Sequence, residues 1–172
     1  MKMMILCCVI TVKSAGIMGL SQLDFEDLRG YAIMIKVLFI CHGNICRSTM
    51  AQFVFQHMVN NQGLKDKFYI DSAATSREEI GNPPHRGTVN KLRELGIPLV
   101  PHRARQVTLD DYDKFDYIIG MDTANIRNLN RMLKHDPEGK IYKLLSFAGS
   151  GRDIADPWYT GDFDETYRDV EE

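Results

Sequence analysis

A cysteine and an arginine lie six positions apart in the segment FICHGNICRST, residues 39–49. Cys41 ends a run of apolar residues, and Arg47 is followed at once by the hydroxyl residue Ser48. A guanidinium is a planar group that matches two oxygens of a phosphate, and a thiolate is a strong nucleophile. The residue types and their spacing therefore favour a loop in which a nucleophile faces a bound phosphate group.

The segments on either side of this loop suit it to anion binding. Residues 35–40 form an apolar run broken by Lys36, which is typical of a buried strand. Apolar residues then recur at helical spacing from Met50 to Met58. A loop between a strand and a helix N-terminus directs backbone N–H groups and positive partial charge at an anion, and the same field favours the thiolate. A nucleotide P-loop is excluded because no Gly-Lys-Ser/Thr ending is present.

These features predict a covalent phosphoryl transfer. Cys41 would attack phosphorus in line and form a phosphocysteine, with Arg47 as the phosphate ligand and Ser48 donating its hydroxyl to the thiolate. Gly43 permits close packing of the loop backbone, and Asn44 tolerates a positive φ. The alternative is a core cysteine beside a helix-surface arginine. The strand–loop–helix context favours the catalytic interpretation.

A proton donor for the leaving group is expected in the sequence DPWY near the C-terminus. A departing phenolate has a conjugate acid with a pKa near 10, so general acid catalysis assists its departure. Asp156 is the candidate acid, and Trp158 and Tyr159 are predicted to wall the pocket entrance and pack on an aromatic ring. An Asp-Pro pair alone usually marks a turn, so this assignment depends on the cysteine loop.

The rest of the chain alternates between strand and helix patterns. Further strands are expected at residues 67–74, 115–121 and 140–147, and residues 151–164 read as a polar loop before a last helix. Such alternation predicts βαβ units. We therefore expect an α/β fold, a three-layer α/β/α domain with a four-stranded parallel sheet and the phosphate-binding loop after the first strand. Sites in such sheets lie at the carboxyl ends of strands.

Composition limits the function classes. The 172 residues are 44% hydrophobic and 26% charged, an ordinary globular mixture, and the net charge of −2 gives no footprint for a nucleic-acid partner. The four cysteines, Cys7, Cys8, Cys41 and Cys46, all lie in the first third of the chain. This distribution favours a reduced, cytoplasmic protein over a disulfide scaffold. Zinc is disfavoured because no further Cys or His follows at finger spacing, and neither metal nor cofactor is expected.

Residues 1–33 differ from the rest. Their apolar stretch, Met3 to Val12, is too short to span a bilayer, which takes about 20 residues, and it fits a signal peptide only loosely. Met34 directly precedes the first strand. We expect residues 1–33 to be an N-terminal extension outside the fold, the product of an over-long gene prediction, and residues 34–172 to form the phosphatase domain without a membrane partner. A membrane-tethered protein is the alternative.

From Ile35 to the C-terminus the chain resembles the low-molecular-weight protein tyrosine phosphatase family. The resemblance is carried by the motifs VLFICHGNICRS, DSAATS, GNPPHRG, HRARQ and DPWYTGDF. It implies metal-independent hydrolysis of phosphotyrosine-containing proteins, with a tyrosine kinase as a candidate partner. It also implies that Cys41 is the nucleophile, that Arg47 binds phosphate, and that Asp156 is the general acid and then the base that activates water.

The resemblance extends to supporting residues. It implies that the phosphate-binding loop comprises His42, Gly43, Asn44, Ile45, Cys46 and Ser48. Ser72 and His102 correspond to residues whose hydrogen bonds shape this loop. Cys46 matches a second loop cysteine that can form a reversible disulfide with oxidised Cys41; simple packing of Cys46 is the equal alternative.

The chain departs from the family pattern at both ends, in its long front end and in a last helix that stops at YRDVEE, where the family usually continues. Three alternative functions share parts of this sequence pattern. A thioredoxin-coupled arsenate reductase needs cysteines beyond Cys46, and none is present. A protein arginine phosphatase of the same family would carry threonine in place of Ile45. A non-catalytic phospho-binding module would not need Cys41, Arg47 and Asp156 together.

Overall fold

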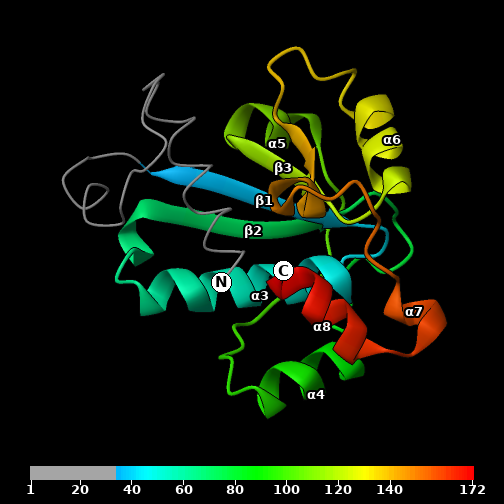
Figure 1. Ribbon diagram of the computed structural model, residues 1–172. Helices are drawn as coiled ribbons and strands as arrows, with labels where there is room; N and C mark the ends of the chain where they lie inside the picture. The colour runs from blue at the N-terminus through cyan, green and yellow to red at the C-terminus, as the bar shows by residue number, and fades with distance from the viewer. Residues whose placement is uncertain (1–33) are drawn as a thin grey trace.

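The computed structural model describes residues 34–172, which build a parallel sheet covered by helices (Figure 1). The four strands stand in the order β2-β1-β3-β4. They are β1 (Ile35–Cys41), β2 (Phe68–Ala74), β3 (Tyr117–Gly120) and β4 (Ile141–Lys143). Every neighbouring pair is parallel. The predicted α/β/α architecture with four parallel strands is confirmed.

The central strand β1 carries the segment that ends in Cys41. It pairs with β2 along its whole length, so that Cys41 lies opposite Ala74, and with β3 on its other side. Both faces of β1 are covered, and five of its seven residues in succession, from Val37 to Cys41, are buried. A continuous apolar run is the pattern expected of such a strand.

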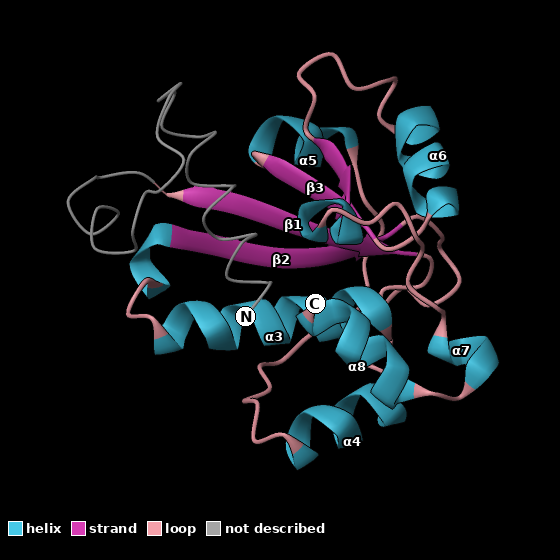
Figure 2. Ribbon diagram, viewed as in Figure 1, coloured by secondary structure: helices cyan, strands magenta, loops and turns pink. Residues whose placement is uncertain are grey.

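Helices cover the two faces of the sheet (Figure 2). Helices α3 (Arg47–Asn61), α4 (Arg86–Glu94) and α8 (Phe163–Glu171) pack against one another on one side. Helices α5 (Leu109–Lys114) and α6 (Thr123–Met132) lie on the other side. The short helices η1 (Lys65–Lys67), η2 (Leu144–Ala148) and α7 (Pro157–Thr160) complete the elements.

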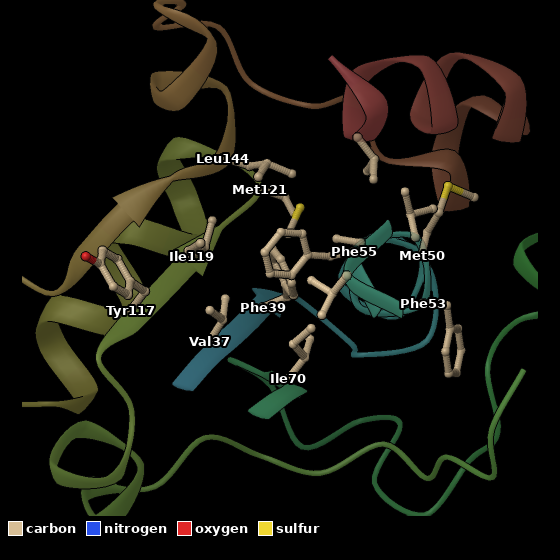
Figure 3. Packing of buried hydrophobic residues seen from close by; sticks show 14 of the residues in the cluster. Val37, Phe39, Met50, Phe53, Phe55, Ile70, Tyr117, Ile119, Met121 and Leu144 are labelled. Atoms are coloured by element: carbon tan, nitrogen blue, oxygen red, sulfur yellow. The ribbon is translucent and has the colours of Figure 1, made fainter. Parts of the chain in front are cut away.

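The larger hydrophobic core fills the space between the sheet and α3 (Figure 3). Phe39 of β1 meets Phe55 of α3 edge-to-face at 5.8 Å between ring centroids, and Phe55 meets Phe68 of β2 at 5.5 Å. Aromatic pairs in this geometry add about 0.5–1.5 kcal/mol beyond their burial. The core thus fixes α3 on β1, and with it the loop that joins them.

Two expected boundaries differ from the structure. The fourth strand was expected over residues 140–147, but β4 ends at Lys143, and residues 144–148 form η2 instead. The pairing of β3 with β4 ends at Gly120 and Lys143, so the chain beyond has no ladder partner and turns Leu144 and Leu145 into the core. The expected polar loop contains α7, whose four residues are too few to show a helical period.

The apolar stretch from Met3 to Val12 lies outside the described residues. Within residues 34–172, no helix has the length and apolar character needed to cross a bilayer.

Candidate active site

The loop between β1 and α3 lies at the carboxyl edge of the sheet, where the sequence predicts the site. Cys41 is the last residue of β1, and Arg47 is the first residue of α3. A pocket of about 110 Å³ opens over this loop. It is lined by Cys41, His42, Gly43, Ile45, Cys46, Glu78, Glu79, Asp156, Trp158 and Tyr159. The structure thus gathers into one pocket residues that lie more than one hundred positions apart in the sequence.

Hydrogen-bond donors converge on the sulfur of Cys41. The backbone N–H of Asn44 donates to Cys41 Sγ at 3.2 Å, and the hydroxyl of Ser48 lies 3.1 Å from the same atom. Asn44 adopts a φ of 59°, a value that Asn tolerates better than most residues. This left-handed turn aims the loop amide at the sulfur. These two contacts fix the position of the sulfur in the pocket.

The second loop cysteine has a different environment. Cys46 is buried in a small apolar cluster with Ile45 and Ala104. Burial, together with the negative charges of Cys41 and Asp156, raises the pKa of Cys46 to about 12. Cys46 therefore remains a thiol at neutral pH, and Cys41 is the loop cysteine suited to nucleophilic attack.

Asn44 is the centre of a buried polar network below the loop. Its Nδ2 donates to the hydroxyls of Ser48 (3.0 Å) and Ser72 (2.8 Å). Its Oδ1 accepts from the backbone N–H of Arg105 (3.1 Å) and lies 3.2 Å from Nε2 of His102. Every polar atom of the Asn44 side chain is thus paired, which rigidifies the loop.

His102 supports this network as a neutral ring. Burial lowers its pKa, an effect that outweighs the opposing influence of the Asp71 carboxylate. In the tautomer that carries its proton on Nε2, His102 donates to Asn44 Oδ1. Ser72 in turn donates from its hydroxyl to Oε1 of Gln52 on α3, at 2.6 Å. Ser72 and His102 therefore both bond to Asn44 of the loop between β1 and α3.

The guanidinium of Arg47 is buried between two carboxylates, with its side chain 3% exposed. Nη1 donates to Oδ2 of Asp122 (2.6 Å) and to the carbonyl of Ile154 (3.2 Å), and Nη2 donates to Oδ2 of Asp156 (2.5 Å). Nε is buried and has no hydrogen-bond partner among the described residues. A donor left over in this way on a fixed guanidinium fits an oxyanion ligand.

Asp156 begins helix α7 and faces Arg47 at the same time. Its Oδ1 accepts from the backbone N–H of Trp158 at 3.1 Å, which caps the helix, while Oδ2 accepts from Arg47. The carboxyl group is 20% exposed and lines the pocket. Trp158 and Tyr159 follow on the pocket wall, 58% and 83% exposed. Asp156, the expected acid, and the expected aromatic residues Trp158 and Tyr159 thus line the same pocket as the loop between β1 and α3.

The opposite rim of the pocket is acidic. Glu78 and Glu79 line it, and Nε2 of the half-exposed His42 lies 3.0 Å from Oε2 of Glu78. A Cβ on Gly43 would approach Cγ of Glu79 to 3.2 Å, so the absence of a side chain lets this segment lie close over the loop.

Two site residues were missed in the sequence. Asp122 caps α6, since its Oδ1 accepts from Asn125 N, and its Oδ2 also accepts from Arg47. The available signal was its place directly after β3, which neighbours β1. Gln52 gave a weaker signal, as a polar residue within the otherwise apolar buried run from Met50 to Phe55 of α3.

No metal site accompanies these groups in the part of the chain that the structure describes: no three His, Cys, Asp or Glu side chains there are grouped to hold an ion.

Comparison with known proteins places this geometry in a family. The family model described as low molecular weight phosphotyrosine protein phosphatase matches residues 36–172. The low molecular weight protein-tyrosine-phosphatase YfkJ of Bacillus subtilis is 46% identical over 134 residues, which is 77% of this chain and 86% of YfkJ. The human low molecular weight phosphotyrosine protein phosphatase is 44% identical over 132 residues, covering 75% and 83% of the two chains.

Solved structures agree with the sequence matches. The crystal structure of YfkJ superimposes with a TM-score of 0.79, covering 83% of this chain and 91% of that one. The structure of DARP, the drosophila arginine phosphatase, matches with a TM-score of 0.72 at 33% identity, covering 79% and 90%. The chain therefore belongs to the low molecular weight phosphotyrosine protein phosphatase family.

Proposed function

We propose that this protein hydrolyses phosphotyrosine in proteins through a phosphocysteine intermediate. One observation carries the proposal: a cysteine sulfur that accepts a loop N–H lies in one pocket with a carboxylate that holds a buried, fixed arginine. The family assignment supports the reaction class. The residue roles rest on the geometry of the pocket.

In the first step, the phosphate dianion is bound by the loop N–H groups and by Nε of Arg47, a donor that has no partner among residues 34–172. Cys41 Sγ attacks phosphorus as the bond to the tyrosine oxygen breaks. Asp156, on the pocket wall, gives its proton to that oxygen, so a neutral phenol departs. Asp122 keeps the guanidinium in place from below.

In the second step, the roles of the acid are reversed. Asp156 now takes a proton from a water molecule, and the resulting hydroxide attacks the phosphocysteine. The bond between sulfur and phosphorus breaks, and inorganic phosphate is released. The Ser48 hydroxyl, 3.1 Å from the sulfur, donates to the thiolate as it leaves.

The pocket favours an aromatic phosphate ester. Trp158 and Tyr159 offer ring faces at the entrance, and the buried Ile45 adds an apolar patch to the lining. An aromatic substrate ring packs well on such surfaces. Phosphoarginine is the competing substrate, and one solved relative is titled an arginine phosphatase. A guanidinium gains no hydrogen bond from Ile45, so phosphotyrosine is the preferred substrate, with a tyrosine kinase as the expected source of the phosphorylated proteins.

The test is hydrolysis of p-nitrophenyl phosphate in the presence of EDTA by the full chain and its variants. Cys41→Ser is expected to abolish turnover, and Asp156→Ala to lower kcat by about 10²–10³-fold. Asp162→Ala is the matched control, because Asp162 also caps a helix with its carboxylate, at the start of α8, where Oδ1 accepts from the backbone N–H of Glu165. Turnover that survives Cys41→Ser would overturn the nucleophile assignment. Phosphotyrosine and phosphoarginine peptides then decide the substrate class.

A further inference from the structure

His85 lies at the junction of the phosphate loop and the segment that carries Asp156. Its backbone N–H donates to the carbonyl of Ile45 in the loop at 2.7 Å. Its ring stacks on Phe163 with centroids 5.2 Å apart and planes 3° from parallel, and it meets Trp158 edge-to-face at 5.8 Å. His85 therefore contacts the loop between β1 and α3 and also Trp158 and Phe163, which lie on either side of Gly161 in the segment that follows Asp156.

The Asp156 segment, residues 156–163, has few other side-chain anchors. Helix α7 within it has four residues, and the left-handed Gly161 ends it. The carboxylate of Asp156 is held by Arg47 at one point. The segment is also held by the ring contacts of Trp158 and Phe163 with His85, by the burial of Pro157, and by the packing of Phe163 on the cluster of Ile45, Cys46 and Ala104.

The contact of Asp156 with Arg47 cannot hold the segment throughout the reaction. In the proposed mechanism Asp156 gives its proton to the leaving oxygen, while the charge of Arg47 is directed to the phosphate. A protonated Asp156 accepts a weaker hydrogen bond from Arg47 than its carboxylate does, so this contact is weakest when the acid must act. The ring contacts of His85 involve neither reacting group, so they persist.

The stack on Phe163 is supported by the local sequence. A Cβ on Gly87 would lie 2.2 Å from the Phe163 ring, so the ring can approach only because residue 87 has no side chain. Gly87 also donates its N–H to Nδ1 of His85 at 3.1 Å, which caps α4 and fixes the His85 ring. Phe163 packs in turn on the cluster that contains Ile45 and Cys46.

We infer that His85 is a positioning residue that holds the Asp156 segment against the phosphate loop through its ring contacts with Trp158 and Phe163. The inference rests on the proposed role of Asp156 as general acid. It predicts that loss of the ring harms acid catalysis more than phosphate binding or nucleophilic attack.

Two variants separate the ring from the helix cap. His85→Phe keeps a ring for Trp158 and Phe163 but loses the acceptor nitrogen. His85→Asn loses the ring but keeps a side-chain acceptor that suits a helix N-cap. His57→Asn, at a partly exposed position on α3, is the matched histidine control.

The first readout is kcat/KM for phenyl phosphate, whose leaving group needs a proton, and for p-nitrophenyl phosphate, whose leaving group is a far weaker base. For His85→Asn we expect kcat/KM to fall by about tenfold with phenyl phosphate and by less than about threefold with p-nitrophenyl phosphate. The tenfold loss is smaller than the full effect of general acid catalysis, because Asp156 itself is still present. His85→Phe and His57→Asn should stay near wild type. Adding His85→Asn to Asp156→Ala should cause no further leaving-group-dependent loss. Equal losses with both substrates, or the loss appearing in His85→Phe instead, would overturn the inference.

The second readout needs no activity. Trp158 is the one tryptophan of the chain, so its fluorescence anisotropy reports on the Asp156 segment alone. His85→Asn should lower the anisotropy both without ligand and with saturating inorganic phosphate. His85→Phe should match wild type in both conditions. Unchanged anisotropy in His85→Asn would overturn the inference even if the catalytic scheme holds. If Asp156→Ala shows no leaving-group dependence, the proposed acid fails, and this readout still decides the positioning role.

Discussion

Arg47 and Asp156, which lie 109 positions apart in the sequence, are joined by a 2.5 Å hydrogen bond between Nη2 and Oδ2. The phosphate ligand and the acid of the proposed mechanism therefore touch each other. Asp122 binds the other terminal nitrogen at 2.6 Å. A cation buried to this degree is costly to desolvate, and its two carboxylate partners offset that cost. The pair of contacts leaves Nε as a buried donor with no hydrogen-bond partner among the described residues.

Arg47→Lys is expected to lower kcat/KM for p-nitrophenyl phosphate by at least about 10²-fold, although the positive charge is kept. A lysine ammonium is a single point donor and cannot bind Asp122, Asp156 and phosphate in the fixed directions of a guanidinium. Steady-state kinetics with a parallel thermal melt measure the effect. Activity within a few-fold of wild type would mean that charge alone, and not the fork geometry, binds the phosphate.

Asp122→Asn tests the support beneath Arg47. We expect kcat/KM to fall by about 10-fold through a higher KM, because the amide nitrogen faces Arg47 and cannot accept from it. The free energy of unfolding should change little, because the amide oxygen can still cap α6 at Asn125. Asp122→Ala should add the loss of the cap, about 1 kcal/mol of unfolding free energy. Denaturant unfolding alongside the kinetics separates the two effects. An unchanged KM in Asp122→Asn would show that Asp122 serves only the helix.

The part of the site that could be predicted is the part that is local in sequence. The strand, the loop and the helix around Cys41 are consecutive, so one apolar run and one helical period place the thiol and Arg47 in the same turn. The positive φ of Asn44 and the cap at Asp122 follow from residue type. These features depend on neighbours along the chain, which the sequence states directly.

The features that were missed depend on which distant segments meet. Asp122 reaches Arg47 because β3 lies beside β1, and the sequence of β3 does not indicate which strand it pairs with. The early end of β4 reflects where its partner strand stops, and not the apolar pattern of residues 140–147. His85 caps α4 through its local sequence, but its contacts with Trp158 and Phe163 arise from the folding of the C-terminal segment onto α4.

Cys46→Ser tests the predicted redox role of the second loop cysteine. After a short treatment with hydrogen peroxide, we expect wild type to recover most of its activity with dithiothreitol, because Cys46 can trap a Cys41 sulfenic acid as a disulfide before it oxidises further. Cys46→Ser should recover several-fold less, with sulfinic acid on Cys41 detected by mass spectrometry. Equal recovery in both proteins would leave Cys46 as a packing residue in its cluster with Ile45 and Ala104.

His102 should make stability depend on pH near neutrality. Burial lowers its pKa below the value of 6.5 that it has in the unfolded chain. As pH falls from about 7, the unfolded chain binds a proton before the folded protein does, so the free energy of unfolding decreases until the pH passes the folded pKa. The contribution is thus fully present above the unfolded pKa and is lost on acidification.

His102→Asn isolates this contribution, because an asparagine amide can still donate to Asn44 Oδ1 but does not titrate. Urea unfolding at pH 7.5, 6.5 and 5.5 should show that the free energy of unfolding of wild type falls relative to that of the variant as pH decreases. Carboxylates elsewhere, including that of Asp71 beside His102, are present in both proteins, so the difference reports on His102. The opposite trend, with wild type gaining on the variant at low pH, would mean that His102 is held as a cation. Its hydrogen bond to Asn44 would then be charge-assisted, and the loop beneath Cys41 would carry a fixed positive charge.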